Sequence, residues 1–238
     1  MPDRTISLPL GWEDVYLVST RDGSDTLFSQ AFGATYHSVF GAVGESKHVF
    51  IQNGLDTRLQ LDHISILEFG FGTGLNAFLA YLFALRHDKP IHYAGIEAFP
   101  IDMKIAEKLD YPAYLAFPEE REIFLRMHVE KDFISGPFHF SRKPHFKDVK
   151  KASSFDCIFF DAFAPGAQPE LWEQSIFEAL FKMTTEGGCI VTYCAQGEVR
   201  RRLIAAGYEV ERLAGPPGKR EMLRGVKRSA ESIEHRVQ

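Results

Sequence analysis

The stretch Ile66–Asn76, ILEFGFGTGLN, decides the fold of this chain. It begins as an apolar run typical of a buried strand and passes through one acid, Glu68. Three glycines then alternate with other residues before a helical pattern starts. Glycine is needed where a backbone turns sharply and comes close to a ligand. The stretch therefore predicts a strand, a ligand-binding loop and a helix, in that order.

The spacing of these glycines separates two kinds of nucleotide ligand. Gly70, Gly72 and Gly74 follow the pattern G-x-G-x-G, whereas the dinucleotide fingerprint G-x-G-x-x-G needs glycine at position 75, which is Leu75. A carboxylate at Glu68 would repel a pyrophosphate but suits a ligand with positive groups. S-adenosylmethionine carries an ammonium and a sulfonium, so we interpret the loop as a methyl-donor site. An ordinary strand-to-helix turn is the alternative.

The composition limits the class of protein. The chain has 238 residues, of which 45% are hydrophobic and 25% charged, as expected for one large α/β domain with a small extension. No apolar run approaches the roughly 20 residues of a membrane span, and the N-terminus lacks a signal-peptide pattern. Cys157, Cys189 and Cys194 fit no zinc pattern, and the histidines form no H-x-x-x-H pair. We therefore expect a cytoplasmic protein with free thiols, no membrane partner and no metal.

From residue 61 the pattern alternates between strands and helices. Strands are expected at Ile64–Glu68, Ile91–Glu97, Phe155–Asp161 and Cys189–Tyr193, and helices at Leu75–Arg86, Asp102–Lys108, Ile123–Met127, Leu171–Met183 and Glu198–Ala206. Phe138–Phe146 is ambiguous and resembles a strand that breaks at Pro144. Tyr208–Leu213 and Glu221–Val226 are expected to close the fold as a hairpin. Such alternation predicts an α/β fold with a mostly parallel, doubly wound sheet.

The two ends of the chain differ from this central part. Residues 1–60 lack the alternation and are punctuated by glycines, so we expect an N-terminal extension of short strands and turns, with one strand at His48–Ile51. Residues 61–228 then form the Rossmann-like domain. The polar residues 229–238 are expected to be a mobile tail.

Four acids fall at or near the carboxyl ends of expected strands, where open α/β sheets bind ligands. Glu68 follows the first strand, and Glu97 follows the second, where it can accept both ribose hydroxyls or simply be a solvated acid. Asp148 precedes a later strand and is a candidate for the adenine amino group. Asp161 ends the most apolar strand, where a carboxylate without a partner is costly. It either caps the loop or holds the acceptor nucleophile beside the methyl donor.

The residues after Asp161 carry a resemblance to a known family. The run Asp161–Trp172, DAFAPGAQPELW, resembles the D-x-F-A-P and N-P-x-x-W blocks of the methyltransferase domain of the bacterial tRNA 5-methylaminomethyl-2-thiouridine biosynthesis protein MnmC, with Gln168 in place of asparagine. Lys219–Leu223 resembles the family's K-R-E-M block. Further matches to the family lie before and between these two blocks, at Glu45, His48–Ile51, Gly54, Leu55, Arg58, Thr192, Tyr193, Gly197, Val199–Arg201, Leu203 and Ala206–Tyr208. Because the chain is too short for the second, FAD-dependent domain, it resembles the stand-alone form, MnmD.

The resemblance implies a class I S-adenosylmethionine-dependent methyltransferase that methylates the amine of 5-aminomethyl-2-thiouridine at the tRNA wobble position. It implies that Asp161 is the catalytic carboxylate. The donor would be bound by Glu68, Gly70, Gly72, Gly74, Asn76, Glu97 and Asp148. The acceptor pocket, which receives the anticodon region of tRNA, would be shaped by Phe163, Pro165, Trp172, Tyr193, Lys219, Arg220 and Glu221.

Other interpretations stay open at this point. A small-molecule N-methyltransferase, an aminopropyltransferase and a non-catalytic nucleoside-binding module would suit the same fold, and Trp172 and Tyr193 would suit ordinary packing. The net charge of −5 argues weakly against nucleic acid. Basic residues nevertheless cluster at Arg142, Lys143, Lys147, Lys150 and Lys151, at Arg200–Arg202, and at Lys219, Arg220, Arg224, Lys227 and Arg228. We take Arg200, Arg201, Lys219 and Arg220 as candidates for phosphate contacts.

Overall fold

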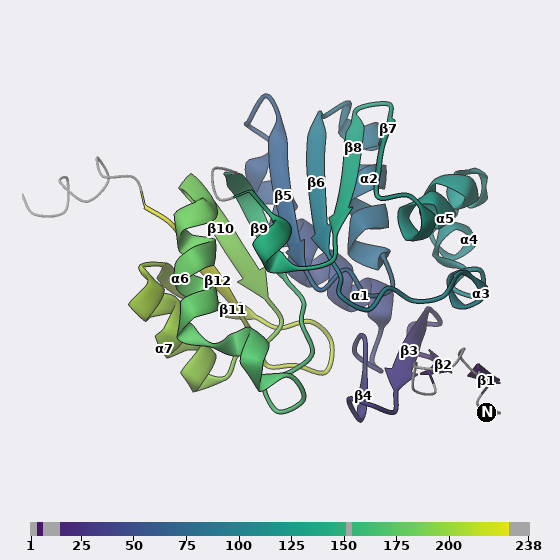
Figure 1. Cartoon of the computed structure of the whole chain (residues 1–238), viewed down its shortest axis with the longest axis horizontal. Coiled ribbons are helices and arrows are strands. Elements are labelled where there is room, and N and C mark those ends of the chain that lie inside the picture. The colour runs from purple at the N-terminus through teal and green to yellow at the C-terminus, as the bar shows by residue number, and fades with distance from the viewer. Residues whose placement is uncertain (1–3, 7–14, 151–153, 229–238) are drawn as a thin grey trace, which may run out of the picture.

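The computed structural model describes residues 4–6, 15–150 and 154–228, and its centre is one large sheet (Figure 1). The strands of this sheet are β5 (Ile64–Phe69), β6 (Ile91–Ile96), β7 (Asp132–Ser135), β8 (Phe138–Lys143), β9 (Phe155–Phe160), β10 (Thr184–Thr192), β11 (Glu209–Ala214) and β12 (Glu221–Val226). Their spatial order is β11-β12-β10-β9-β5-β6-β8-β7. The expected tail at 229–238 lies outside the described residues.

The central strands run parallel, as the apolar runs predicted. Strand β5 pairs in parallel with both β6 and β9, and the parallel pairing continues to β8 on one side and β10 on the other. The hairpin of β11 and β12 adds to β10 in the antiparallel sense, which confirms the expected C-terminal hairpin. The ambiguous segment forms β8, preceded by the unexpected antiparallel strand β7. The chain order reverses between β5 and β9, and a crevice for a ligand forms at such a point.

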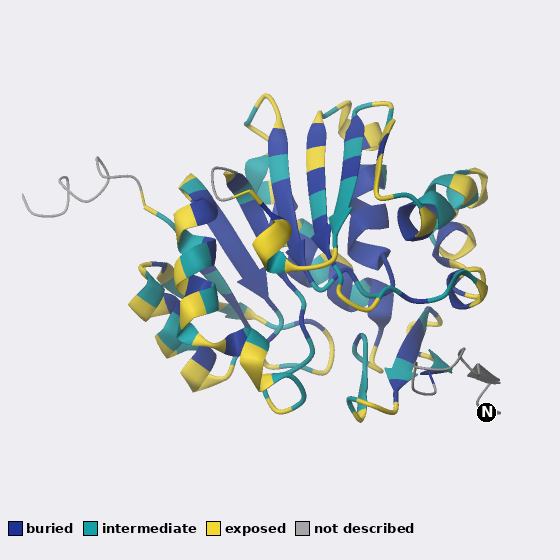
Figure 2. Cartoon of the chain, in the orientation of Figure 1, coloured by how far each residue is buried: buried dark blue, intermediate teal, exposed yellow. Residues whose placement is uncertain are grey.

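Helices cover both faces of the large sheet. They are α1 (Ala42–Ser46), η1 (Lys47–Gln52), η2 (Leu55–Arg58), α2 (Leu75–His87), α3 (Met103–Ala106), α4 (Tyr111–Tyr114), η3 (Pro118–Glu120), α5 (Arg121–Val129), η4 (Phe146–Asp148), η5 (Pro169–Trp172), α6 (Gln174–Met183) and α7 (Gly197–Ala206). One apolar cluster joins α1, η1, α2 and α5 to the sheet, and the other joins η5, α6 and α7 to its opposite face. Figure 2 shows the central strands buried and the outer sides of α6 and α7 exposed. No helix within the described ranges is long and apolar enough to span a bilayer.

A smaller antiparallel sheet precedes these elements. It consists of β1 (Arg4–Ile6), β2 (Val15–Ser19), β3 (Asp25–Ser29) and β4 (Ala34–Thr35) in sequential order. The strand expected at His48–Ile51 was wrong, because these residues belong to the helical segment α1–η1. Ser46, Val49 and Phe50 are buried at helical spacing, and this segment packs on α2. A division of the chain near residue 60 stays a prediction.

The helix expected over Leu171–Met183 is divided in two. Its first residues belong to η5, which ends at Trp172, and α6 begins only at Gln174. Glu173 between them has an extended backbone. The break comes directly after Trp172, whose buried indole donates a hydrogen bond to the preceding loop. This contact fixes the backbone of η5 at a position from which the chain must turn before α6 begins.

Candidate active site

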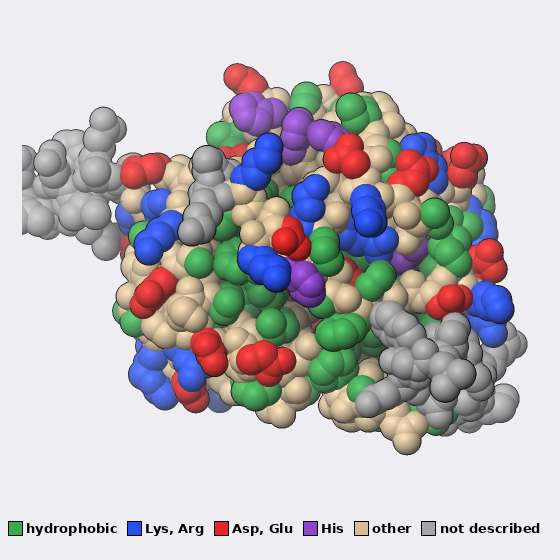
Figure 3. Space-filling model, in the orientation of Figure 1, with side chains coloured by type: hydrophobic (Ala, Val, Ile, Leu, Met, Phe, Trp, Pro, Cys, Tyr) green, Lys and Arg blue, Asp and Glu red, His purple; other side chains and the backbone are tan. Residues whose placement is uncertain are grey.

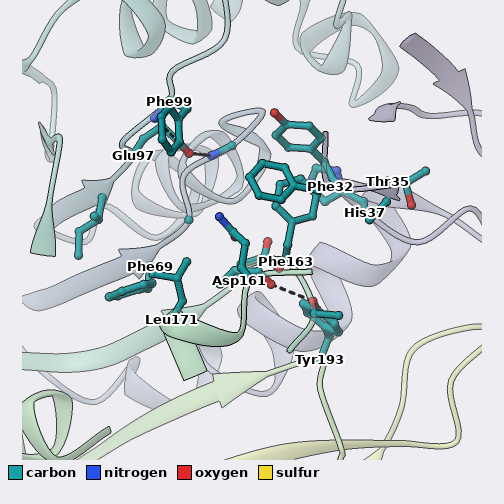
Figure 4. A pocket seen from close by; sticks show the side chains of 18 of the residues that line it. Phe32, Thr35, His37, Phe69, Glu97, Phe99, Asp161, Phe163, Leu171 and Tyr193 are labelled. Atoms are coloured by element: carbon teal, nitrogen blue, oxygen red, sulfur yellow. Dashed lines mark hydrogen bonds between the residues drawn. The ribbon is translucent and has the colours of Figure 1, made fainter. Parts of the chain in front are cut away.

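A cavity of about 740 Å³ opens beside the carboxyl ends of β5, β6 and β9 (Figure 4). Its walls come from the glycine loop, the loop after β9, the loop between β11 and β12, and the β3–β4 region of the small sheet. Of the residues predicted for the site, Gly70, Gly72, Glu97, Asp161, Phe163, Tyr193 and Lys219 line it. Two sheets that are distant in the sequence thus share one cavity.

The glycine loop needs its glycines for backbone geometry. Gly70, Gly72 and Gly74 have φ values of 95°, 52° and 75°, which side chains rarely tolerate. A Cβ at Gly70 would lie 2.6 Å from the carbonyl oxygen of Asp161. Gly70 and Gly72 line the cavity, whereas Gly74 is the N-cap residue of α2 and faces Phe71 behind it. The loop therefore offers bare backbone to a ligand at two of its three glycines.

Glu97 is held at the edge of this loop. Its Oε2 accepts a hydrogen bond of 2.8 Å from the Gly72 amide, and its Oε1 accepts one of 2.8 Å from the Phe99 amide (Figure 4). Burial raises the pKa of the Glu97 carboxyl, and the two amides partly offset that effect. A carboxylate has lone pairs beyond these two bonds, so Glu97 keeps acceptor capacity for ligand hydroxyls.

A buried polar chain stands behind Asp161. The Asn76 side-chain amide donates to Glu68 Oε1 at 2.9 Å and to Asp161 Oδ2 at 2.8 Å. Glu68 is fully buried and Asn76 nearly so, and neither lines the cavity. Burial raises the pKa values of both Glu68 and Asp161 well above their usual range. Glu68 and Asn76, predicted to line the methionine end of a donor, thus position Asp161 from behind in this structure.

A second carboxylate lies near Asp161. Glu45 from α1 forms an ion pair with the ammonium of Lys219 and accepts a hydrogen bond of 2.6 Å from the Ser38 amide. Its charge adds to the burial that raises the pKa of Asp161. The Lys219 Nζ lies 3.9 Å from the centre of the Tyr193 ring. This ion pair therefore links α1 to the loop between β11 and β12 on the other side of the cavity.

Aromatic rings form the wall opposite Glu97. Phe163 stacks on Phe32 with ring centres 4.6 Å apart, and Tyr36 meets Phe163 edge-on at 4.9 Å. Figure 4 shows Phe32 and Phe163 together beside Asp161. The Tyr193 hydroxyl donates to the Ala162 carbonyl at 2.8 Å, so Tyr193 offers its ring to the cavity.

Trp172 does not reach this wall. Its side chain is fully buried against Phe160 and Phe177, and its Nε1 donates to the Phe163 carbonyl at 2.7 Å. The indole therefore supports the loop that carries Phe163, and the packing interpretation holds for Trp172 in this structure.

Four more predicted residues lie outside the cavity. The Asp148 side chain is exposed and accepts a 3.1 Å hydrogen bond from the His145 amide, capping its own turn. Pro165 lines a separate shallow groove next to α7. Arg220 is exposed, and Glu221 lies 3.9 Å from Arg212. The structure does not bring these four together with Asp161 in one cavity.

Several cavity residues were missed from the sequence. They are Phe32, Tyr36 and His37 from the segments beside β4, Glu45 from α1, Phe99 from the loop after β6, and Phe146 from η4. His37 Nδ1 lies 3.0 Å from Thr26 Oγ1, and burial lowers the pKa of His37 to about 4. The aromatic spacing Phe28, Phe32, Tyr36 was the available signal. Within the described ranges, no group of three or more His, Cys, Asp or Glu residues is arranged to hold a metal ion.

Comparison with known proteins agrees with this geometry. Residues 141–228 match the family of S-adenosyl-L-methionine-dependent methyltransferases. The chain is 33% identical to the tRNA 5-methylaminomethyl-2-thiouridine biosynthesis bifunctional protein MnmC of Aromatoleum aromaticum, over 88% of this chain and 35% of that protein. It is 36% identical to MnmC of Leptospira borgpetersenii, over 84% and 33% respectively. The chain thus spans about a third of the length of these relatives.

A solved structure extends the likeness to the fold. The structure of MnmC2 from Aquifex aeolicus superposes with a TM-score of 0.75 at 25% identity, covering 98% of this chain and 77% of that one. These findings confirm the Rossmann-like fold and the cofactor that the glycine loop predicted. The chain carries an S-adenosyl-L-methionine-dependent methyltransferase domain and is related over most of its length to MnmC.

Proposed function

We propose that this protein transfers a methyl group from S-adenosylmethionine to the primary amine of 5-aminomethyl-2-thiouridine at the wobble position of tRNA. The observation that supports it best is the continuity of the cavity. One space of about 740 Å³ joins the glycine loop and Glu97 to Asp161 and the aromatic wall. Donor and acceptor can therefore meet within one space. A tRNA substrate also implies a cytoplasmic location.

The residues around the loop fit the donor. Gly70 lines the cavity with bare backbone, since the Asp161 carbonyl leaves no room for a Cβ there, and Glu97 has acceptor capacity left for ribose hydroxyls. Behind the loop, the Asn76 side-chain amide joins Glu68 to Asp161 and so fixes the polar floor of this end of the site. When bound there, S-adenosylmethionine supplies an already activated methyl group on a sulfonium.

Asp161 is proposed to prepare the acceptor. An aliphatic amine is mostly protonated at neutral pH, and an ammonium has no lone pair for attack. Because burial raises the pKa of Asp161, its carboxylate is a stronger base than an exposed aspartate. The hydrogen bond from Asn76 fixes Oδ2, so the other oxygen, Oδ1, is the one that orients the amine and takes its proton.

The rest of the wall positions the nucleobase. A base that leaves the anticodon stack needs a new stacking partner, and Phe32 and Phe163 provide rings beside Asp161. The apolar rings also disfavour the ammonium form of the acceptor. The Lys219 charge is neutralised by Glu45, so Lys219 adds little repulsion toward an incoming amine. Positioning of this kind supplies roughly 7–11 kcal/mol in favourable reactions.

Mass spectrometry of tRNA nucleosides tests the proposal. Bulk tRNA from a strain blocked before the methylation step is incubated with the protein and S-adenosylmethionine, then digested. We expect 5-aminomethyl-2-thiouridine to be converted to the 5-methylaminomethyl nucleoside. The same reaction with free small amines and no tRNA is the control. Methylation of the free amines with no change in the tRNA would assign the chain to a small-molecule enzyme instead.

A further inference from the structure

Three basic residues at the C-terminal end of the hairpin, Arg224, Lys227 and Arg228, are occupied within the protein. Arg224 Nε pairs with Glu211 at 2.7 Å, and Arg228 pairs with Glu209. The Lys227 ammonium donates to two backbone carbonyls, at 2.8 and 3.2 Å. Charges held by internal acids and carbonyls have little capacity left for the phosphates of a partner.

The basic residues of α7 stand next to acids. Arg202 pairs with Glu198 of its own helix. The shallow groove beside them is also lined by Glu170 and Glu173, both exposed, and Glu170 lines the main cavity as well. Glu170 therefore places negative charge on the η5 side of the cavity, with Glu173 in the adjoining groove, and a phosphate backbone there would meet like charges.

The opposite side of the cavity carries lysines without partners. Lys143 ends β8, and Lys147 and Lys150 lie in and just after η4. We call these three residues the η4 lysine patch. Their side chains make no ion pair or hydrogen bond with any residue that the structure describes, and Lys147 and Lys150 are exposed. The chain between them, at Pro144–Phe146, lines the cavity itself.

The charge balance of the patch is positive. Residues 141–150 contain four basic residues and a single acid, Asp148. The Asp148 carboxylate accepts a hydrogen bond from the His145 amide in its own turn. Figure 3 shows Lys and Arg side chains over the part of this face where β8 and η4 lie, and acidic side chains over η5. Lys151, predicted as part of this cluster, lies outside the described residues.

We infer that the η4 lysine patch holds the phosphate backbone of the RNA next to the nucleotide that enters the cavity. The inference rests on the proposed function and adds the direction from which the RNA approaches. Lysine ammonium groups bind phosphates as point charges, and each contact releases counterions. In this arrangement the RNA crosses the cavity mouth on the η4 side, and Arg200 and Arg201, which line no part of the cavity, do not carry the phosphate contacts.

Salt-dependent tRNA binding tests this assignment. The variant Lys147→Gln/Lys150→Gln is compared with Arg86→Gln/Lys182→Gln. The second variant removes two exposed charges near the C-terminal ends of α2 and α6, outside the cavity. We expect the first variant to bind tRNA about tenfold more weakly at moderate salt, and its plot of log affinity against log salt to be shallower by about 1.5. The second variant should match the wild type. S-adenosylmethionine affinity, measured in parallel, should be equal in all three.

Two results would overturn the inference. One is an unchanged salt slope in Lys147→Gln/Lys150→Gln. The other is a larger loss of tRNA affinity in Arg201→Gln than in the patch variant. Methyl transfer by the wild type to precursor tRNA is measured with the same protein. Its absence would refute the proposed function, whereas a methylating wild type with an unaffected patch variant would refute the lysine assignment alone.

Discussion

The two sheets contribute opposite halves of the cavity, and different kinds of interaction hold the side chains of each half in place. The large sheet provides polar groups fixed by hydrogen bonds, such as Glu97 at the glycine loop and Asp161 held by Asn76. The small sheet and the segment after it provide rings, Phe32 and Tyr36, whose contacts to Phe163 are apolar. Fixed polar geometry suits a donor of constant shape and a proton acceptor. Apolar stacking suits a flat base that must enter and leave.

This contrast leads to separate expectations for the two halves. Changes in the large sheet should affect donor binding or the chemical step, and changes in the small sheet should affect acceptor binding. A variant that crosses this division would show that the halves act as one unit.

Replacing Asp161 should have the largest effect. In Asp161→Asn the side chain can still accept the hydrogen bond from Asn76, but it can no longer take a proton. We expect turnover to fall about 1,000-fold, within the range for loss of a general base. Affinity for S-adenosylmethionine should change little, because the donor contacts are elsewhere. Single-turnover rates and calorimetric titration of the donor measure the two quantities. Near-normal turnover would exclude Asp161 as the proton acceptor.

Gly70→Ala comes next, because the new methyl group has no space. Its Cβ would lie 2.6 Å from the Asp161 backbone oxygen, and φ is already 95°. We expect donor affinity to fall on the order of 100-fold, equivalent to ~3 kcal/mol, because the backbone is strained and the loop is displaced. Gly166→Ala is the matched control, since nothing lies within 4 Å of a Cβ there. Equal donor affinity in both variants would show that the loop does not form the donor site.

The sequence predicted the large sheet far better than the small one. Buried parallel strands such as β5 and β9 are mostly apolar runs, and the residues at their carboxyl ends follow from order alone. Glu97 and Asp161 were expected at this edge in that way, and both line the cavity, while their roles stay predictions. Phe32 was not, because its place opposite Phe163 depends on a contact between residues far apart in the chain. The His48–Ile51 error reflects a run too short to separate strand from helix periodicity.

Side-chain direction limited the rest of the site prediction. Asp148 has the expected place in the chain, yet its carboxylate turns back to cap its own turn. Trp172 has the family spacing, yet its N–H has a carbonyl partner within the core and its ring follows it inward. A motif gives the residue type and the loop, but local hydrogen bonding decides which atoms reach the ligand.

His37 tests how the two halves are joined. It lies between Thr26 of the small sheet and Thr73 of the glycine loop, and its pKa is lowered to about 4 from 6.5. The unfolded chain therefore binds a proton more readily than the folded one below pH 6.5. We expect His37 to cost about 2 kcal/mol of unfolding free energy between pH 7 and pH 5, roughly 30-fold in the folding equilibrium.

Urea denaturation of the wild type and of His37→Asn at pH 7 and pH 5 isolates this effect. The variant has no group that titrates at this position, so its stability should fall less on acidification. His128, whose pKa is lowered to about 3, is present in both proteins and cancels in the comparison. Parallel pH profiles for the two proteins would mean that His37 is accessible to protons in the folded state.

Phe32→Ala should have the smallest effect and the most selective one. It removes the ring that stacks on Phe163 and leaves the polar groups of the large sheet in place. We expect the KM for tRNA to rise about tenfold, as for loss of one base–aromatic contact, with donor affinity unchanged. Phe117→Ala is the control, because Phe117 is exposed and outside the cavity. If Phe32→Ala instead lowers donor affinity, the small sheet helps to form the donor site, and the division of labour between the two sheets is wrong.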